Sequence, residues 1–306
     1  MIRKISLTRL TTRLLFLVPF AAILYNPSPG LATAFAPDLG SASSFAALAG
    51  GPADGAVTCT NSTVTGDVGV VSPGTFTDTD CTITGTVDTD ATEAYADFLL
   101  AYYALQYNTP CETLLSGTLA NVTLTPGVYC FTAAATLTGV LKLNAQGDPN
   151  AVWIFKIGAG TDGNGATGAL TTTSFTVDMI GGGQPCNVYW WVAQAATLNT
   201  SIFQGIILAG ADITLNYSTL NGDALAGGAG TNEEPTGAVT FTGSTVTACQ
   251  ATGGGNVRGS KCNQGVGNGP EDDCDPGNSN QGDPSRSNDE LGGTPGNPGR
   301  KGGNGK

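Results

Sequence analysis

The chain has 306 residues with 24 acidic and 12 basic side chains and no histidine, which gives a net charge of −12 at pH 7. Between Phe35 and Gln250 the only cations are Lys142 and Lys156. Nucleic acids and anionic membrane surfaces are bound through clustered Lys and Arg, so this balance argues against both partners. The absence of histidine removes the commonest general base and metal ligand.

The first 34 residues have the pattern of a secretory signal peptide. Four basic residues precede an apolar run from Leu14 to Leu24, and Ala32-Thr33-Ala34 follows as a small-x-small cleavage site. The run is shorter than the ~20 apolar residues that a membrane-spanning helix needs. We therefore expect residues 1–34 to be removed near Ala34, and the rest of the chain to be secreted without membrane insertion.

The sequence pattern predicts that residues 35–250 form one mainly β domain. Short runs of Thr, Val, Ile, Leu and Phe alternate with Gly, Asn, Asp and Pro turns. Within this domain Phe203–Ala209 recurs as Leu220–Ala226, 17 residues later, and each copy leads into a short alternating strand. A fixed short period of this kind predicts a solenoid, in which equivalent positions of successive turns stack.

One segment, Asp90 to Gln106, has helical spacing. Asp90 is the expected N-cap, with Glu93 three residues later, and an aromatic and leucine stripe follows at Tyr95, Phe98, Leu99, Tyr102 and Leu105. We expect this stripe to pack along the side of the solenoid. The runs 151–157 and 187–192 are almost wholly apolar, which predicts strands covered on both faces. Lys156, in the first run, is expected at a solvated strand end.

The chain has eight cysteines, an even number that indicates disulfides in an exported protein. A metal cluster is the weaker alternative, because there is no histidine and no Cys-x-x-Cys pair. Proximity and stacking suggest the pairs Cys59–Cys81, Cys111–Cys130, Cys186–Cys249 and Cys262–Cys274.

Residues 251–306 differ in amino-acid composition from the preceding domain. They are rich in Gly, Asn, Pro, Asp and Ser and have almost no large apolar side chains, so we expect a largely disordered tail. Asp272, Asp273 and Asp275 could attract a calcium ion, but their spacing does not match an EF-hand loop.

Three strands of equal pattern predict a flat surface of small side chains. Alternation turns Ala196, Leu198 and their equivalents inward. The outward positions are Ala195, Thr197, Asn199, Asp212, Thr214, Asn216, Ala238, Thr240 and Thr242. An earlier strand puts Thr75, Thr77 and Thr79 on one side, and Ser44, Ala46 and Leu48 are expected to add a rung.

Threonine in the middle of such a grid suits a surface that orders water. Its stiff χ1 fixes a methyl group and a hydroxyl group in regular places. A ladder spaced near the repeat of ice could therefore merge with an ice surface. The alternative is a threonine-rich sheet without any ligand, because threonine is a favoured strand residue.

The chain resembles the bacterial and fungal ice-binding, or antifreeze, family from about Leu39 to Val246. The stretches that carry the resemblance are Leu39–Ser41, Phe45–Ala49, Gly66–Gly69, Leu124–Tyr129, Ala151–Phe155, Asn187–Trp190 and Phe203–Ala209. The resemblance implies a right-handed, discontinuous β-helix solenoid with one long flanking helix and no cofactor. It also implies an ice-binding face on the Thr197, Thr214 and Thr240 strands, with N-terminal rungs near Thr75 and Thr77.

The sequence thus favours a secreted, monomeric, non-enzymatic ice-binding protein that adsorbs to an ice crystal surface and inhibits growth and recrystallisation. An extracellular structural or adhesive solenoid without ice affinity is the alternative. A third hypothesis is a carbohydrate-active enzyme that uses Asp78 and Asp80, since alternation puts that pair on one strand face. Asp88 and Asp90 form a second pair of this kind.

Overall fold

The computed structural model describes residues 34–51, 55–165, 167–228 and 237–249. The expected signal peptide, except Ala34, lies outside these residues. So do the expected disordered tail, the pair Cys262–Cys274 and the candidate calcium ligands. No helix in the described ranges is both long enough and apolar enough to cross a bilayer.

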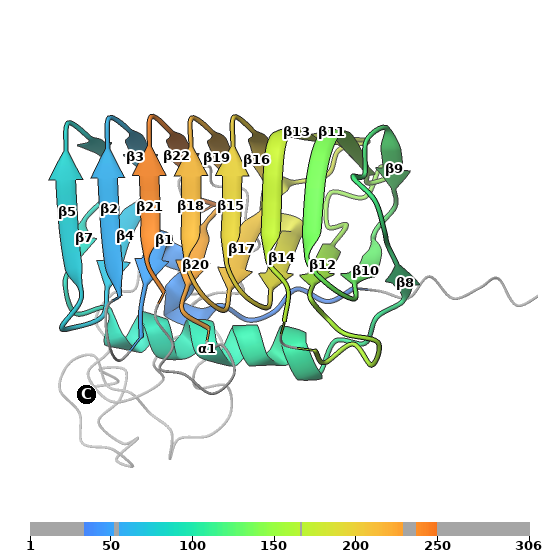
Figure 1. Ribbon diagram of the computed structural model, residues 1–306, viewed down its shortest axis with the longest axis horizontal. Coiled ribbons are helices and arrows are strands. Elements are labelled where there is room, and N and C mark those ends of the chain that lie inside the picture. The colour runs from blue at the N-terminus through green and yellow to red at the C-terminus, as the bar shows by residue number, and fades with distance from the viewer. Residues whose placement is uncertain (1–33, 52–54, 166, 229–236, 250–306) are drawn as a thin grey trace, which may run out of the picture. The chain divides into compact units, whose positions relative to one another are not determined.

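The described residues form a mainly β solenoid of parallel strands with one α-helix along its edge (Figure 1), as expected. One wall is a nine-stranded sheet. In spatial order its strands are β7 (Val87–Asp88), β4 (Asp67–Val70), β1 (Phe45–Ala49), β20 (Ala224–Ala226), β17 (Ile206–Ala209), β14 (Val188–Val192), β12 (Trp153–Ile157), β10 (Gly127–Phe131) and β8 (Thr113–Leu114).

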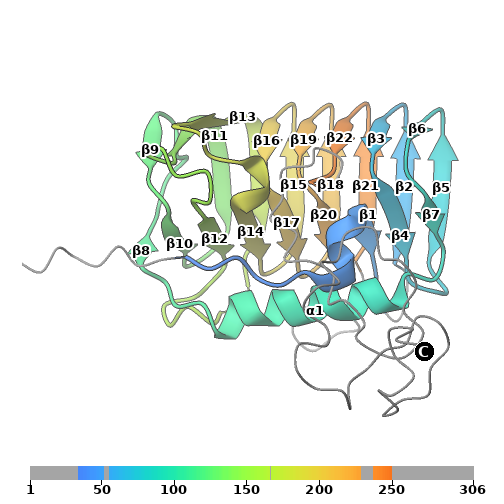
Figure 2. The same cartoon turned by 180° about the vertical axis from the view of Figure 1, so that it is seen from behind.

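The 13-stranded sheet folds around a corner and forms the other two walls. Its front wall contains β5 (Thr75–Thr79), β2 (Ala56–Thr60), β21 (Val239–Thr242), β18 (Ile213–Asn216), β15 (Ala196–Asn199) and the first halves of β13 (Leu170–Ile180) and β11 (Ala135–Asn144). The adjoining wall, seen from behind in Figure 2, contains β16 (Ile202–Gln204), β19 (Thr219–Asn221), β22 (Thr245–Thr247), β3 (Thr63–Thr65), β6 (Thr82–Ile83) and β9 (Val122–Leu124).

The solenoid is discontinuous in sequence, as expected. Strand β20, near the end of the domain, pairs with β1, and β21 pairs with β2. The N-terminal strands therefore stack beyond the last C-terminal rung, where a rung is one level of strands around the three walls. The two copies of the repeat lie on neighbouring rungs, since Phe203 pairs with Leu220 and Ile207 with Ala224.

Helix α1 (Thr92–Tyr107) packs outside the nine-stranded sheet. Phe98, Tyr102 and Leu105 are buried, and Tyr102 lies against Trp191 of β14, with ring centroids 5.3 Å apart. The predicted helix is thus confirmed to within two residues at each end. Strands β12 and β14, covered by core inside and by other elements outside, are buried at every position, as their apolar runs predict.

Two local expectations about this region are wrong. Asp90 does not cap the backbone of α1; the N-cap is Ala91, and the Asp90 carboxylate accepts a hydrogen bond from the Thr92 hydroxyl at 2.7 Å. Lys156 is not at a solvated end. It is 0% exposed, and its Nζ donates to the carbonyl oxygens of Gln106 and Thr109 at 3.0 and 2.7 Å, at the C-terminal end of α1.

The corner between the front wall and its neighbour is built the same way on successive rungs. A residue in the left-handed region, with φ near +50°, turns the chain at Asn61, Thr200, Tyr217 and Gly243. A buried serine follows each of them at Ser62, Ser201, Ser218 and Ser244. These four corners follow β2, β15, β18 and β21, so neighbouring strands of the front wall end at the same level.

Three of the predicted disulfides are confirmed: Cys59–Cys81, Cys111–Cys130 and Cys186–Cys249. The first joins the last two rungs of the solenoid at its β5 end, because Cys59 lies in β2 and Cys81 follows β5. The second ties β10 to the segment after α1. Cross-links of this kind stabilise a fold mainly by restricting the unfolded chain.

Candidate functional site

The front wall presents three straight columns of side chains, which together we call the Thr face. The middle column runs through seven threonines paired strand to strand: Thr136, Thr171, Thr197, Thr214, Thr240, Thr58 and Thr77. The second column is Thr138, Thr173, Asn199, Asn216, Thr242, Thr60 and Thr79. The third, two residues before the middle one, is Ala134, Ala169, Ala195, Asp212, Ala238, Ala56 and Thr75.

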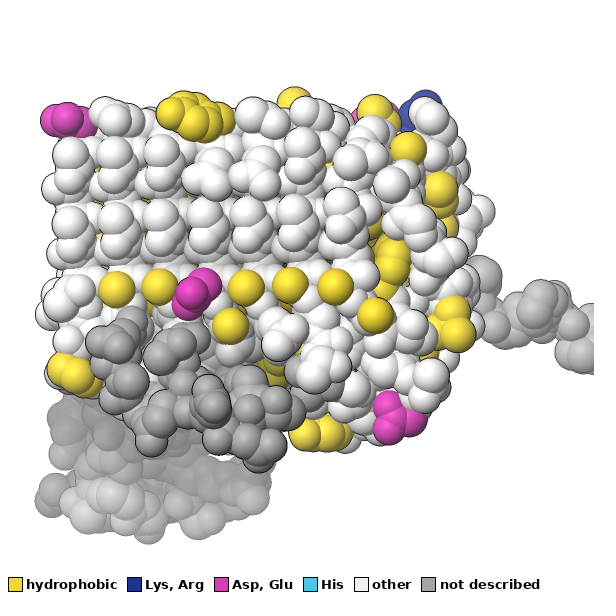
Figure 3. All heavy atoms as spheres, viewed as in Figure 1, with side chains coloured by type: hydrophobic (Ala, Val, Ile, Leu, Met, Phe, Trp, Pro, Cys, Tyr) yellow, Lys and Arg dark blue, Asp and Glu magenta, His cyan; other side chains and the backbone are white. Residues whose placement is uncertain are grey.

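Strand geometry fixes the dimensions of the Thr face. Neighbouring strands lie ~4.8 Å apart and alternate residues ~6.7 Å apart along a strand, so seven strands and three columns cover roughly 29 by 13 Å. Figure 3 shows this wall as rows of small side chains, with two polar rows above a row of small apolar ones that contains one carboxylate. Small residues at each column position keep the surface level.

The wall is stiff because its inner side is packed. Between the outward threonines, Leu198, Leu215 and Phe241 point into the core and are 0% exposed. Threonine has few rotamers in a strand, and each strand but β5 and β11 has a hydrogen-bonded neighbour on both sides along the wall. The outward hydroxyl and methyl groups are therefore held at regular positions.

Two asparagines in the second column are fixed by side-chain hydrogen bonds. Nδ2 of Asn216 donates to Oδ1 of Asn199 at 3.0 Å, and Nδ2 of Asn199 donates to the carbonyl oxygen of Thr172 at 3.3 Å. Both side chains are half-buried. The amide pair thus continues the column in a single orientation where threonine is interrupted.

Asp212 is the one charged residue in the three columns of the Thr face. It is exposed, and its Oδ1 accepts a hydrogen bond from the backbone N–H of Ala238 at 2.9 Å. The carboxylate therefore replaces a backbone acceptor where the chain re-enters the wall at β21. This contact holds Asp212 against the neighbouring strand.

All twelve residues predicted for the site lie on this one wall. Thr197, Thr214 and Thr240 are direct pairing partners in neighbouring strands. The Thr75, Thr77 and Thr79 strand, β5, lies at one end, and β2 separates it from β21.

Three rungs of the Thr face were not predicted from the sequence, and one predicted rung lies elsewhere. Thr58 joins the middle column through the discontinuous stacking of β2 on β21, and Thr136 and Thr171 extend it at the other end. The same Thr-x-Thr pattern in 58–60, 136–138 and 171–173 was the available signal. The rung expected from Ser44, Ala46 and Leu48 is wrong. Strand β1 belongs to the nine-stranded sheet, where Ala46 is 0% exposed in the core inside the solenoid and Leu48 is 0% exposed beneath α1.

The adjoining wall carries a narrower set of threonines. Thr219, Thr245 and Thr63 pair in one column, and Asn221, Thr247 and Thr65 pair in the next. Its strands β16, β19, β22 and β3 have three residues each, so it offers two outward columns where the Thr face has three. The exposed Ile202 also interrupts its first column.

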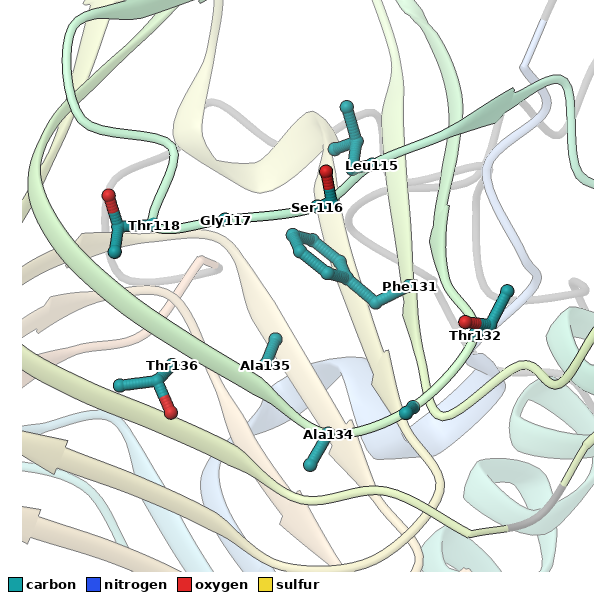
Figure 4. Close-up of a pocket in the computed structure, with 10 residues that line it drawn as sticks. Leu115, Ser116, Gly117, Thr118, Phe131, Thr132, Ala134, Ala135 and Thr136 are labelled. Atoms are coloured by element: carbon teal, nitrogen blue, oxygen red, sulfur yellow. The ribbon is translucent and has the colours of Figure 1, made fainter.

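A shallow cavity of about 340 Å³ lies where the Thr face ends. It is lined by residues 115–118 and 131–136, and the Phe131 ring projects between Ser116 and Ala135 (Figure 4). Strand β9 pairs with β11 only over Leu141–Leu143, so no further strand covers the Ala135–Thr138 half of β11. None of its lining residues is charged.

The carboxylate pairs considered for catalysis serve local turns. Oδ1 of Asp78 accepts the N–H of Cys81 at 2.9 Å, and Oδ1 of Asp88 accepts the N–H of Asp90 at 2.9 Å. Within the described ranges no cluster of three or more Cys, Asp or Glu side chains could hold a metal ion. These contacts are those of ordinary capped turns.

Fold and surface together define a class of protein: a discontinuous, helix-flanked β-solenoid that displays a flat threonine array. The chain belongs to the family described as Ice-binding-like, whose family model matches residues 30–247. It is 37% identical over 185 residues to an ice-binding protein of Nostoc sp. (strain HG1), a match that covers 58% of this chain and 63% of that relative. The chain thus matches less than two thirds of that relative's length.

Solved structures agree with this assignment. An ice binding protein from an Antarctic Biological Consortium superposes with a TM-score of 0.60 and 32% identity, over 71% of this chain and 92% of the other. An ice-binding protein from the Antarctic ascomycete Antarctomyces psychrotrophicus gives a TM-score of 0.58 and 33% identity, over 70% of this chain and 98% of the other.

Proposed function

We propose that this chain is a secreted ice-binding protein that adsorbs to ice through the Thr face and so inhibits ice growth and recrystallisation. The observation that carries the proposal is the unbroken middle column of seven threonines in register. Membership of the family and likeness to proteins described as ice-binding support it.

The physical argument concerns water next to the wall. Apolar methyl groups restrict the orientations of neighbouring water molecules, and hydroxyl groups anchor water at fixed points. A rigid, repeating array holds both kinds of group in place before the protein contacts ice. Little side-chain entropy is therefore lost on binding. Ice growth is then opposed where the adsorbed protein interrupts the advancing surface.

We further propose that the protein works by adsorption, without a chemical step or cofactor, and acts outside the cell. The local hydrogen bonds of Asp78 and Asp88 support the first point. The three disulfides support the second, because such bonds persist mainly in oxidising compartments.

Substitution on the two threonine-bearing walls tests the proposal. Thr214→Tyr and Thr240→Tyr each place a bulky ring on the middle column and should abolish ice-growth inhibition by the purified protein. Thr245→Tyr, an equal change on the adjoining wall, is the matched control and should leave inhibition unchanged. Ice crystal shape and the gap between melting and freezing temperatures are the measured quantities.

Two outcomes would contradict the proposal. If the wild-type protein lets round crystals grow freely at high concentration, the chain does not bind ice, and the adhesive or structural alternative takes its place. If Thr214→Tyr and Thr240→Tyr retain full activity, ice binding through the Thr face is wrong. Circular dichroism of every variant separates loss of binding from loss of fold.

A further inference from the structure

The corner beside the Thr face carries a further row of side chains, which we call the corner column. Each member directly follows a residue of the second column and has φ between 47° and 57°. In spatial order the members are Ser174, Thr200, Tyr217, Gly243, Asn61 and Asp80. Alternation along a strand would turn a residue at this place inward, but the left-handed backbone turns it outward, and all except Gly243 are exposed. The corner column therefore lies on the rim of the Thr face, at the top of the wall in Figure 3.

Tyr217 is the one aromatic residue in the corner column. Glycine and asparagine adopt positive φ readily, as Gly243 and Asn61 do, whereas a bulky side chain is an outlier there. Thr200 is also unusual at this place, but it keeps the small hydroxyl side chain of the neighbouring columns. The Tyr217 side chain is 69% exposed, so burial of its ring does not offset the backbone cost. A residue that breaks a local backbone rule without a packing gain indicates a functional position.

The neighbouring rung leaves room for the Tyr217 ring. A Cβ atom added to Gly243 would lie 2.6 Å from Cδ1 and 2.7 Å from Cε1 of Tyr217. The ring therefore occupies the place of a side chain at position 243 and extends along the rim across two rungs. The backbone is fixed on both rungs, because the N–H of Tyr217 donates to the carbonyl oxygen of Thr242 at 2.8 Å and the N–H of Gly243 donates to that of Thr60 at 3.0 Å.

We propose that Tyr217 is a contact residue for ice and that it extends the Thr face onto the corner column, an inference that rests on the proposed function. The tyrosine ring offers an apolar surface that restricts water orientation, and its hydroxyl anchors water. These are the two kinds of group that each threonine of the wall supplies. Tyrosine has only two side-chain torsions, so a ring already held over Gly243 loses little entropy on binding.

Replacement of Tyr217 by asparagine tests the contact. Asn61 shows that asparagine fits this corner, so the variant should fold. The concentration needed for half-maximal inhibition of ice recrystallisation should rise about three- to fivefold, less than for a change in the middle column. The fraction of protein taken up by slowly growing ice should fall as well. Release of the backbone strain should leave the melting temperature of the protein unchanged or raise it by about 2–4 °C.

Three further variants separate the ring from its surroundings. Tyr217→Phe keeps the ring and should inhibit recrystallisation within about twofold of the wild type. Tyr107→Asn makes the same change at a tyrosine that is 59% exposed on α1, outside the nine-stranded sheet. Ile202→Asn removes an exposed apolar side chain from the adjoining wall. Neither asparagine control should change inhibition or uptake into ice.

The outcomes distinguish this inference from the proposed function. A wild type without any inhibition overturns both. A wild type that inhibits ice growth, together with a Tyr217→Asn variant of equal activity, overturns the role of Tyr217 and leaves the Thr face as the binding surface. A Tyr217→Asn variant that loses activity and also melts at a lower temperature overturns it too, because the ring then supports the corner instead of contacting ice.

Discussion

The backbone N–H of Ser218 donates a hydrogen bond to the hydroxyl oxygen of Ser244 at 3.1 Å, one rung away. Ser201 makes the same contact to Ser218 at 3.0 Å, and Ser244 makes it to Ser62 at 3.0 Å. Each of these hydroxyls also lies within hydrogen-bond reach of the carbonyl oxygen two residues earlier. A buried serine ladder thus runs beside the Thr face and forms the corner at which β15, β18, β21 and β2 end.

Replacing Ser218 with alanine should destabilise the solenoid. The change leaves the buried N–H of Ser201 without its acceptor, which costs about 1–3 kcal/mol of unfolding free energy. Chemical denaturation measures this loss. Thr245→Ala, an exposed change on the adjoining wall, should stay within about 0.5 kcal/mol of the wild type. Equal unfolding midpoints for the two variants would show that the ladder contributes nothing to stability.

Replacing Lys156 with methionine should loosen the end of α1. The Lys156 ammonium donates to the carbonyl oxygens of buried Gln106 and half-buried Thr109, and methionine removes the donor from both. We expect a loss of about 1–3 kcal/mol. Lys142→Met, on an exposed lysine, is the control and should have no comparable effect.

The difference in unfolding free energy between wild type and Lys156→Met should depend on pH. Burial lowers the pKa of Lys156 from 10.5 to about 8, so between these values the unfolded chain binds more protons than the folded one. Wild-type stability contributed by this group therefore rises as pH increases from 8 to 10.5. The stability difference between wild type and Lys156→Met should grow over that range. A constant difference would contradict the assigned cause.

Much of the fold was predictable, because repeats, alternation and helical spacing are local signals. The Thr197, Thr214 and Thr240 strands share one pattern, and their register follows from it. The rung of Thr58 was missed because it is set by the stacking of an N-terminal strand on a C-terminal one, which no local pattern records.

The errors had physical causes of the same kind. Lys156 is buried because the end of α1 offers two carbonyl oxygens, a contact between segments far apart in the sequence. Ala46 and Leu48 alternate like face residues, yet the register of β1 shifts between Phe45 and Ala47, and Ala46 lies in the solenoid core while Leu48 packs beneath α1. Alternation predicts which residues share a side only in a regular strand, and tertiary packing decides which side is exposed.

Asp223 should make the protein more stable in mild acid than at neutral pH. It is 0% exposed beside Tyr189; Oδ1 accepts the N–H of Cys249 at 3.0 Å, and Oδ2 has no partner among the described residues. Burial raises the pKa of Asp223 from 3.8 to about 7. The folded chain thus holds a proton that the unfolded chain releases, and stability falls between about pH 4 and pH 7.

Asp223→Asn should remove that fall, since the amide oxygen still accepts the Cys249 N–H and no charge is buried. The gain in unfolding free energy of Asp223→Asn over the wild type should be larger at pH 8 than at pH 4.5 by about 3 kcal/mol, the part of the pKa shift that lies between these pH values. Denaturant titrations of both proteins at the two pH values measure it. Parallel pH profiles for wild type and variant would contradict the assignment of this effect to Asp223.

Asp212 should weaken the Thr face, because a carboxylate must lose water when the wall meets ice. Asp212→Asn removes the charge and keeps an oxygen for the Ala238 N–H. We expect ice-growth inhibition at a given concentration to rise about two- to fivefold, which corresponds to roughly 0.4–1 kcal/mol of binding free energy. Asp212→Ala also removes the acceptor and should lower unfolding free energy by about 0.5–1.5 kcal/mol.

The control for this prediction is Asp178→Asn, which makes the same chemical change in the part of β13 beyond the corner, off the Thr face. Inhibition of ice growth should be unchanged by it. If the two asparagine variants are equally active, the charge of Asp212 has no effect on binding and the prediction is wrong. If Asp212→Asn is weaker than the wild type while equally stable, the carboxylate assists binding. The Asp212 carboxylate, held by the Ala238 N–H, would then be part of the recognition surface and would anchor water beside the middle column.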